Sequence, residues 1–150
     1  MKKLLGYVAF AVTALMLTFS PVAAEEDDLY RRLAIQVSDN DPGTFNKALN
    51  VAANFARATT ENGYEPVIEI VAFNAGLHML REDNSPVLER IASMSGSLPD
   101  IQFSACGNTI AGMTRNEGAA PPLSEHAVVV PGGVGRLMAL DAQGYFVIRP

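Results

Sequence analysis

Apolar side chains follow two different spacings along the chain. In residues 45–56 they recur every three or four positions, which is the spacing of one face of an amphipathic helix. Elsewhere they form short continuous runs rich in Val, Ile and Phe, which are typical of buried strands. These runs predict strands over residues 33–37, 66–73, 100–105, 125–133 and 145–150.

Helical segments are expected between these strands. Asn62 and Gly63 give the first helix a standard end, because glycine adopts the left-handed conformation that helix ends favour. Ser85 is expected to cap a later helix with Pro86 at its first position, and Asn108 to cap a short one. The other helical segments are expected over residues 74–83, 109–113 and 134–144.

Strands that alternate with helices through short connections predict an α/β fold. The expected architecture is a doubly wound, mainly parallel sheet of about five strands flanked by helices. Ligands of such sheets bind beyond the carboxyl ends of the strands. Three segments follow predicted strands there, and we expect the site among them: residues 38–44, 74–76 and 106–109.

The first 24 residues have the layout of a secretory signal. Lys2 and Lys3 precede an uncharged, mostly apolar run over residues 4–19, and residues 22–24 offer the small side chains of a cleavage site. The run is shorter than the ~20 residues that span a bilayer, which disfavours the alternative of a retained anchor. We expect cleavage after Ala24, leaving one domain of residues 25–150 that is periplasmic or otherwise exported.

Cleavage also changes the charge of the protein. The full chain has a formal net charge of −5, and loss of Lys2 and Lys3 leaves nine basic against sixteen acidic residues, so the net charge becomes about −7. Such a surface repels phosphate backbones and anionic lipids. Nucleic-acid partners are therefore not expected, nor is membrane association after cleavage.

Cys106 is the one cysteine in the chain, so no internal disulfide can form. It ends a predicted strand and precedes Gly107 and Asn108. A thiolate there would meet free N–H groups and the positive end of a helix dipole, and both lower a thiol pKa. A buried, inert cysteine accounts equally well for the local sequence. Both interpretations stay open on these residues alone.

The other candidates for chemistry are weaker. His78 and His126 have neither the local signature of a catalytic base nor a metal-ligand spacing, so no metal site is expected. Asp39 and Asp41 could hold a cation, but helix capping explains the same loop. Residues 131–138, PGGVGRLM, lack the ending of a phosphate-binding loop and are interpreted as a strand-to-helix turn.

Four blocks in order resemble the DsrE/DsrF-like family, also called the YchN-like fold. They are AIQVSDNDPGTFNKALNVAANF, IEIVAFNAGLHML, FSACGNT and VVVPGGVGRLMALDAQGYFVIRP. The resemblance spans nearly all of residues 25–150 and is strongest around Cys106. It implies a doubly wound sheet of about five strands and oligomers, commonly trimers or hexamers. In the best-understood members a cysteine after a mid-chain strand carries sulfur as a persulfide, and Cys106 matches that position.

The leading hypothesis is an exported DsrE-like protein that binds or relays sulfur through Cys106. Its partner would be a sulfur donor or acceptor protein or a small sulfur compound, and the resemblance implies a homotrimer or homohexamer. Persulfide transfer needs no metal, histidine or cofactor, and none is expected. One alternative is a non-catalytic oligomeric protein that binds a small ligand and keeps a structural cysteine; another is a redox-sensing thiol. The residues expected to contact the ligand are Asp39, Asn74, Gly107, Asn108 and Thr109.

Overall fold

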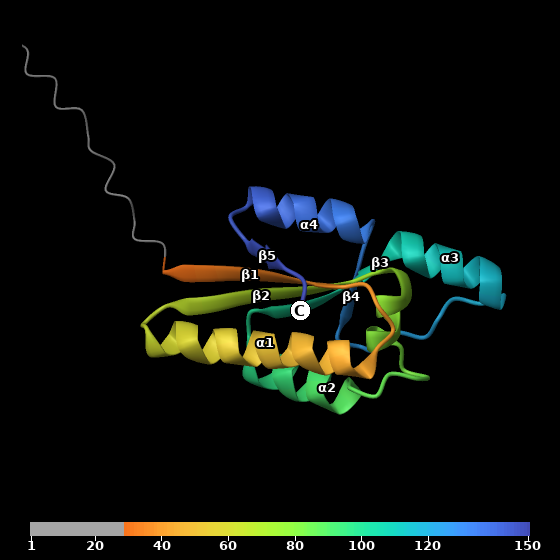
Figure 1. Cartoon of the computed structure of the whole chain (residues 1–150). Helices are drawn as coiled ribbons and strands as arrows, with labels where there is room; N and C mark the ends of the chain where they lie inside the picture. The colour runs from red at the N-terminus through yellow and green to blue at the C-terminus, as the bar shows by residue number, and fades with distance from the viewer. Residues whose placement is uncertain (1–28) are drawn as a thin grey trace, which may run out of the picture.

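Five parallel strands form a sheet in the order β4-β3-β2-β1-β5 (Figure 1). The computed structural model describes residues 29–150, so the expected signal segment of residues 1–24 lies outside the described residues. The strands are β1 (Tyr30–Val37), β2 (Glu65–Ala72), β3 (Ile101–Cys106), β4 (Ala127–Val130) and β5 (Phe146–Ile148).

Helices cover both faces of this sheet. Figure 1 shows α1 (Pro42–Glu61) and α2 (Leu88–Ser97) on one face and α4 (Gly133–Ala142) on the other. The chain steps in one direction from β1 to β4 and then returns past β1 to β5. Because parallel crossovers are right-handed, that reversal puts α4 on the opposite face. The expected doubly wound α/β fold is therefore confirmed.

Two apolar clusters hold the layers together. The larger one packs α1, through Phe45, Leu49 and other side chains of its predicted apolar face, against the sheet. The smaller one lies under α4 and joins Leu137 and Leu140 to Phe73 and Cys106. Cys106 thus belongs to the less extensive core.

The remaining helices lie near the carboxyl ends of the strands, which form the rim of the sheet. The 3-10 helix η1 (Asn74–Leu80) follows β2 directly, and α3 (Gly107–Glu117) follows β3 without a loop. In Figure 1, α3 projects away from the rim, and none of its residues is fully buried. Ile110 and Met113 of α3 are partly buried and pack against the larger cluster.

Two expected helix starts are wrong. Helix α3 begins at Gly107 with Cys106 in the N-cap position, so Asn108 lies in the first turn, where its N–H donates to the carbonyl of Pro131 at 3.2 Å. Helix α2 begins at Leu88. The helix therefore starts later than expected, although the Ser85 hydroxyl does accept from the N–H of Val87 at 3.3 Å while it donates to the carbonyl of Met79 at 2.6 Å.

Candidate functional site

Cys106 lies at the rim, where it is both the last residue of β3 and the N-cap residue of α3. It pairs in register with Val130, the last residue of β4. The chain that follows β4 therefore starts directly beside Cys106. Two helices, α3 and α4, begin within three residues of these two strand ends.

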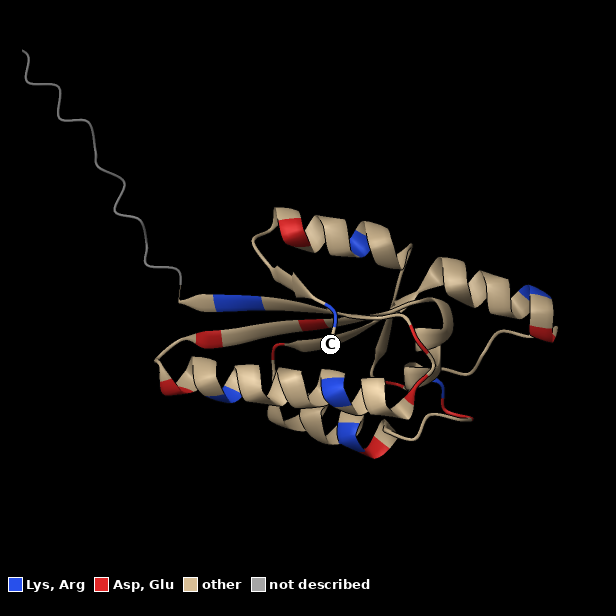
Figure 2. Cartoon of the chain, viewed as in Figure 1, with Lys and Arg blue, Asp and Glu red and all other residues tan. Residues whose placement is uncertain are grey.

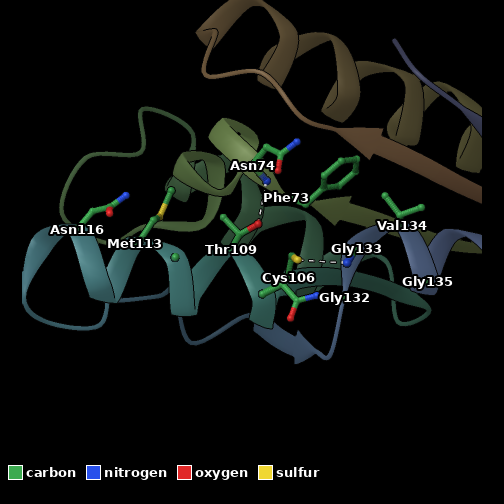
Figure 3. A pocket seen from close by; sticks show the side chains of 12 residues that line it. Phe73, Asn74, Cys106, Thr109, Met113, Asn116, Gly132, Gly133, Val134 and Gly135 are labelled. Carbon is green, nitrogen blue, oxygen red and sulfur yellow. Dashed lines mark hydrogen bonds between the residues drawn. The ribbon is translucent and has the colours of Figure 1, made fainter.

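A cleft of about 530 Å³ opens at the rim between α3 and α4 (Figure 3). Cys106 lines it but is only 4% exposed, so a reactant must enter the cleft to reach the thiol. The lining residues come from the ends of β2 and β3 and from both helices: Phe73, Asn74, Cys106, Asn108, Thr109, Gly112, Met113, Asn116, Gly132, Gly133, Val134 and Gly135.

Hydrogen-bond donors from both helices surround the Cys106 sulfur. The N–H of Gly133, the first residue of α4, donates to Sγ at 3.2 Å. Burial by itself raises the pKa of Cys106, but the hydroxyl of Thr109 and the amides of Thr109, Gly133 and Asn108 lower it. The net effect is a pKa below that of an ordinary thiol, as expected for a thiolate that meets helix N-termini.

Thr109 is itself held in place by the first residue of η1, which follows β2. The backbone N–H of Asn74 donates to Thr109 Oγ1 at 2.9 Å. Asn74 has a φ of 49°, in the left-handed region that asparagine tolerates better than most residues. The turn after β2 therefore orients the hydroxyl that acts on Cys106.

The walls of the cleft are neutral. None of the twelve lining residues is an acid, a lysine, an arginine or a histidine, and the first residues of α3 and α4 are tan in Figure 2, the colour of residues other than Lys, Arg, Asp and Glu. Asn74 and Asn116 offer amide groups, whereas Phe73, Met113 and Val134 offer apolar surface. The lining therefore offers a Cys106 thiolate hydrogen bonds and no cationic side chain. This arrangement suits a nucleophile more than an acid–base catalyst.

The structure brings most, but not all, of the expected ligand residues into this cleft. Asn74, Asn108 and Thr109 line it together with Cys106. Gly107 does not line it, because its backbone packs against β4, where an added Cβ would lie 3.1 Å from the carbonyl oxygen of Val130. Asp39 also lies outside the lining, and its carboxylate pairs instead with Arg149 at 2.7 Å.

The contribution of Gly132 to Gly135 to the cleft was not expected from the sequence. Gly132 ends the short connection from β4 to α4, which was interpreted as a strand-to-helix turn, and Gly133 to Gly135 form the first turn of α4. Together they supply one wall of the cleft and a donor to the thiol. The close approach requires glycine at position 133, since a Cβ there would lie 2.7 Å from the Cβ of Phe73. The order of the strands would have revealed this, because β4 ends beside β3 at the rim.

The histidines and carboxylates form no second centre near the cleft. His78 Nδ1 lies 3.2 Å from the side-chain oxygen of Asn84, and His126 lies 3.9 Å from Glu125. Within residues 29–150, no group of three or more His, Cys, Asp and Glu side chains is arranged to hold a metal ion. No helix in that same range has the length and apolar character to cross a membrane.

Comparison with known proteins supports the fold. The chain is similar to a solved structure titled as the protein of unknown function MTH1491 from Methanobacterium thermoautotrophicum, with 27% identity and a TM-score of 0.63. The match covers 80% of this chain and 99% of that one. No family model matches the chain, and a search of curated proteins found no match.

Proposed function

We propose that this chain is a DsrE-like sulfur carrier that holds sulfur as a persulfide on Cys106. The observation that carries the proposal is the position of the Cys106 sulfur. It lines a cleft, accepts a hydrogen bond from Gly133 at 3.2 Å, and has a pKa below that of an ordinary thiol. A larger thiolate fraction at neutral pH favours attack on sulfur.

The proposed step is an exchange between sulfur atoms. The Cys106 thiolate attacks the terminal sulfur of a donor persulfide R–S–SH, forming a new S–S bond on Cys106 while the donor's S–S bond breaks. The donor leaves as the thiolate R–S⁻, and Cys106 keeps the –SH group. Electrons balance without any external oxidant, and the same reaction in reverse passes the sulfur to an acceptor thiol.

The cleft favours a neutral or weakly charged donor. Its walls carry no charged side chain, and Cys106 is 4% exposed, so the donor sulfur must enter between α3 and α4. A small sulfur compound or a short segment of a donor or acceptor protein would fit these conditions. The proposal includes export of the protein, based on residues 1–24; N-terminal sequencing of envelope material should then begin near Glu25.

A binding protein with a structural cysteine is the second candidate. Cys106 packs in the apolar cluster with Leu137 and Leu140 and is 4% exposed, as an inert cysteine would be. In that case the cleft would hold a small ligand without covalent chemistry. The two candidates differ in whether the native thiol reacts.

Intact-mass measurement of protein purified from its own compartment tests the proposal. A persulfide on Cys106 adds one sulfur atom, about 32 Da, and is removed by a thiol reductant. Cys106→Ser is the control, since it should fold normally and never gain this mass. Repeated absence of the added mass after incubation with a donor persulfide, with Cys106 unmodified, would favour the binding protein.

A further inference from the structure

A buried carboxylate lies beneath α4, on the face of the sheet that also carries Cys106. Glu69 of β2 is 3% exposed, and its two oxygens pair with Arg136 of α4. Arg136 Nε lies 2.7 Å from Oε1 and Nη2 lies 2.6 Å from Oε2, so the pair is bidentate. Because an unpaired buried carboxylate is costly, this geometry fixes the distance between the sheet and α4.

The same carboxylate is also hydrogen-bonded to β3, the strand that ends in Cys106. The buried hydroxyl of Ser104 donates to Glu69 Oε1, and Gln102 donates to the Ser104 hydroxyl at 2.8 Å. Ser104 lies two residues before Cys106, so both side chains point to one face of β3. Glu69 therefore joins α4 to the strand that ends in the thiol.

Arg136 connects this anchor to the thiol through the backbone. Its N–H donates to the carbonyl of Gly132 at 2.9 Å, closing the first turn of α4. That turn contains Gly133, whose N–H donates to Cys106 Sγ. The side chain and the backbone of one residue thus hold the turn that presents the donor.

The apolar contacts of α4 do not by themselves fix the position of this helix along the sheet. Leu137 and Leu140 are the large apolar side chains that α4 buries, whereas Val134 and Met138 are exposed. Two buried leucines fix the distance of a helix from a sheet better than they fix its position along the sheet. A bidentate ion pair restricts both.

We infer that Arg136 is a positioning residue for Cys106: paired with Glu69, it holds the first turn of α4 so that the Gly133 N–H points at Sγ. The positioning of the thiol follows from the geometry alone. Only the use of that positioning in sulfur transfer rests on the proposed function. Tyr145 and Asp100 border the same polar pocket and are left unchanged in the test.

The test compares three changes at this pair. Arg136→Met removes the anchor, Arg136→Lys keeps the charge without the bidentate geometry, and Glu69→Gln with Arg136→Met removes the pair at constant net charge. Arg57→Met is the matched control, because Arg57 pairs with Glu61 on the exposed side of α1. The rate of Cys106 alkylation is measured against pH, and hydrogen exchange of the Gly133 amide is followed by NMR. Circular dichroism establishes that each variant is folded.

The expected result is slower alkylation at pH 7 by about fivefold in Arg136→Met and in the double variant, the effect of losing about one hydrogen bond. The Gly133 amide should exchange faster in both, Arg136→Lys should recover part of the rate, and Arg57→Met should match the wild type. If Arg136→Met does not fold, the alkylation rates and Gly133 exchange rates of the double variant and of Arg136→Lys test the inference.

Wild-type alkylation and wild-type Gly133 exchange in the folded variants would overturn the inference. So would an effect in Arg136→Met that disappears in the double variant, because charge rather than position would then be the cause. Measuring persulfide loading of Cys106 distinguishes failure of this inference from failure of the proposed function. If loading never occurs but alkylation and exchange change as expected, the inference stands and the sulfur-carrier proposal fails. If the wild-type thiol is unreactive, the exchange of the Gly133 amide decides the inference.

Discussion

The hydroxyl of Thr109 accepts a hydrogen bond from the backbone N–H of Asn74 at 2.9 Å, across 35 residues of sequence. This contact ties the first turn of α3 to the start of η1 and leaves the hydroxyl proton free to act on Cys106. Burial raises the pKa of the thiol, and the Thr109 hydroxyl is the largest of the influences that lower it. The reactivity of Cys106 should therefore depend on this one side chain.

Thr109→Val should slow alkylation of Cys106 at pH 7 by about three- to tenfold, the effect of losing one hydrogen bond worth about 1 kcal/mol. Valine keeps the shape of threonine but lacks the hydroxyl. Thr109→Ser is the control, because it keeps the hydroxyl and should stay close to the wild-type rate. Equal rates for the valine and serine variants would show that the hydroxyl does not act on the thiol.

The stability of the protein should depend on the titration of Cys106. Its pKa is lower in the folded state than the 9.0 of an ordinary thiol, so its contribution is fully present above about pH 9 and is lost as the pH falls through the folded value. The difference in unfolding free energy between wild type and Cys106→Ser should therefore grow as the pH rises from 6 to 9. Denaturant unfolding across this range measures it. A difference that stays constant or shrinks with rising pH would contradict the lowered pKa.

Much of the fold was predictable because it follows from local patterns. The apolar face of α1, including Phe45 and Leu49, is visible as a three- and four-residue spacing, and it is buried as that spacing requires. The strands are visible as short apolar runs, although their ends shift by a few residues. Such features depend on side chains that are close together in the sequence.

The site was predictable only in part, because half of it depends on the order of the strands. Asn74, Asn108 and Thr109 follow strands that were predicted to end at one rim, and they do line the cleft. Gly133 lies 27 residues beyond Cys106, and nothing local indicates that its N–H meets the thiol. Asp39 follows a strand at the same rim, but its pairing with Arg149 is not visible in the sequence.

Gly133→Ala should be more harmful than Gly135→Ala, although both lie in the first turn of α4. A Cβ at position 133 would lie 2.7 Å from the Cβ of Phe73, whereas one at position 135 meets nothing within 4 Å. We expect Gly133→Ala to cost about 1–3 kcal/mol and to slow Cys106 alkylation, because the helix must move away from the thiol. Gly135→Ala should stabilise the protein by roughly 0.5–1 kcal/mol. Thermal unfolding and alkylation rates measure both, and similar effects at the two positions would contradict the packing described.

The ion pairs of Arg81 should stabilise the packing of α3, and this stabilisation should depend on pH. It is 6% exposed, and its guanidinium hydrogen bonds lower the pKa of Asp83 and of Glu117, the last residue of α3. Lowered carboxyl pKa values stabilise the fold above about pH 4, and that stabilisation is lost as the pH falls through the folded values.

Arg81→Met should therefore remove part of the acid dependence of stability between about pH 2 and 5 and speed hydrogen exchange in α3. Arg57→Met is again the control, since its ion pair with Glu61 is exposed. Unfolding curves at several pH values measure the effect. Parallel pH profiles for wild type and Arg81→Met would show that the ion pairs do not stabilise the fold.

The last prediction is that the protein forms a homotrimer or homohexamer. The resemblance to the DsrE/DsrF-like family implies such assemblies. One edge of the sheet also offers a surface for contact with another chain. Strand β4 (AVVV) lies at that edge without a charged residue, and Val128 and Val129 are 48% and 57% exposed. Unprotected apolar edge strands favour pairing with another chain.

Light scattering under reducing conditions should give three or six times the mass of one mature chain. Val128→Lys with Val129→Lys should lower that mass while circular dichroism stays unchanged, because charge on an edge strand opposes pairing. Phe146→Lys, at the exposed opposite edge on β5, is the matched control. A monomeric wild type at micromolar concentration would contradict the prediction, and dissociation by Phe146→Lys alone would move the interface from β4 to β5.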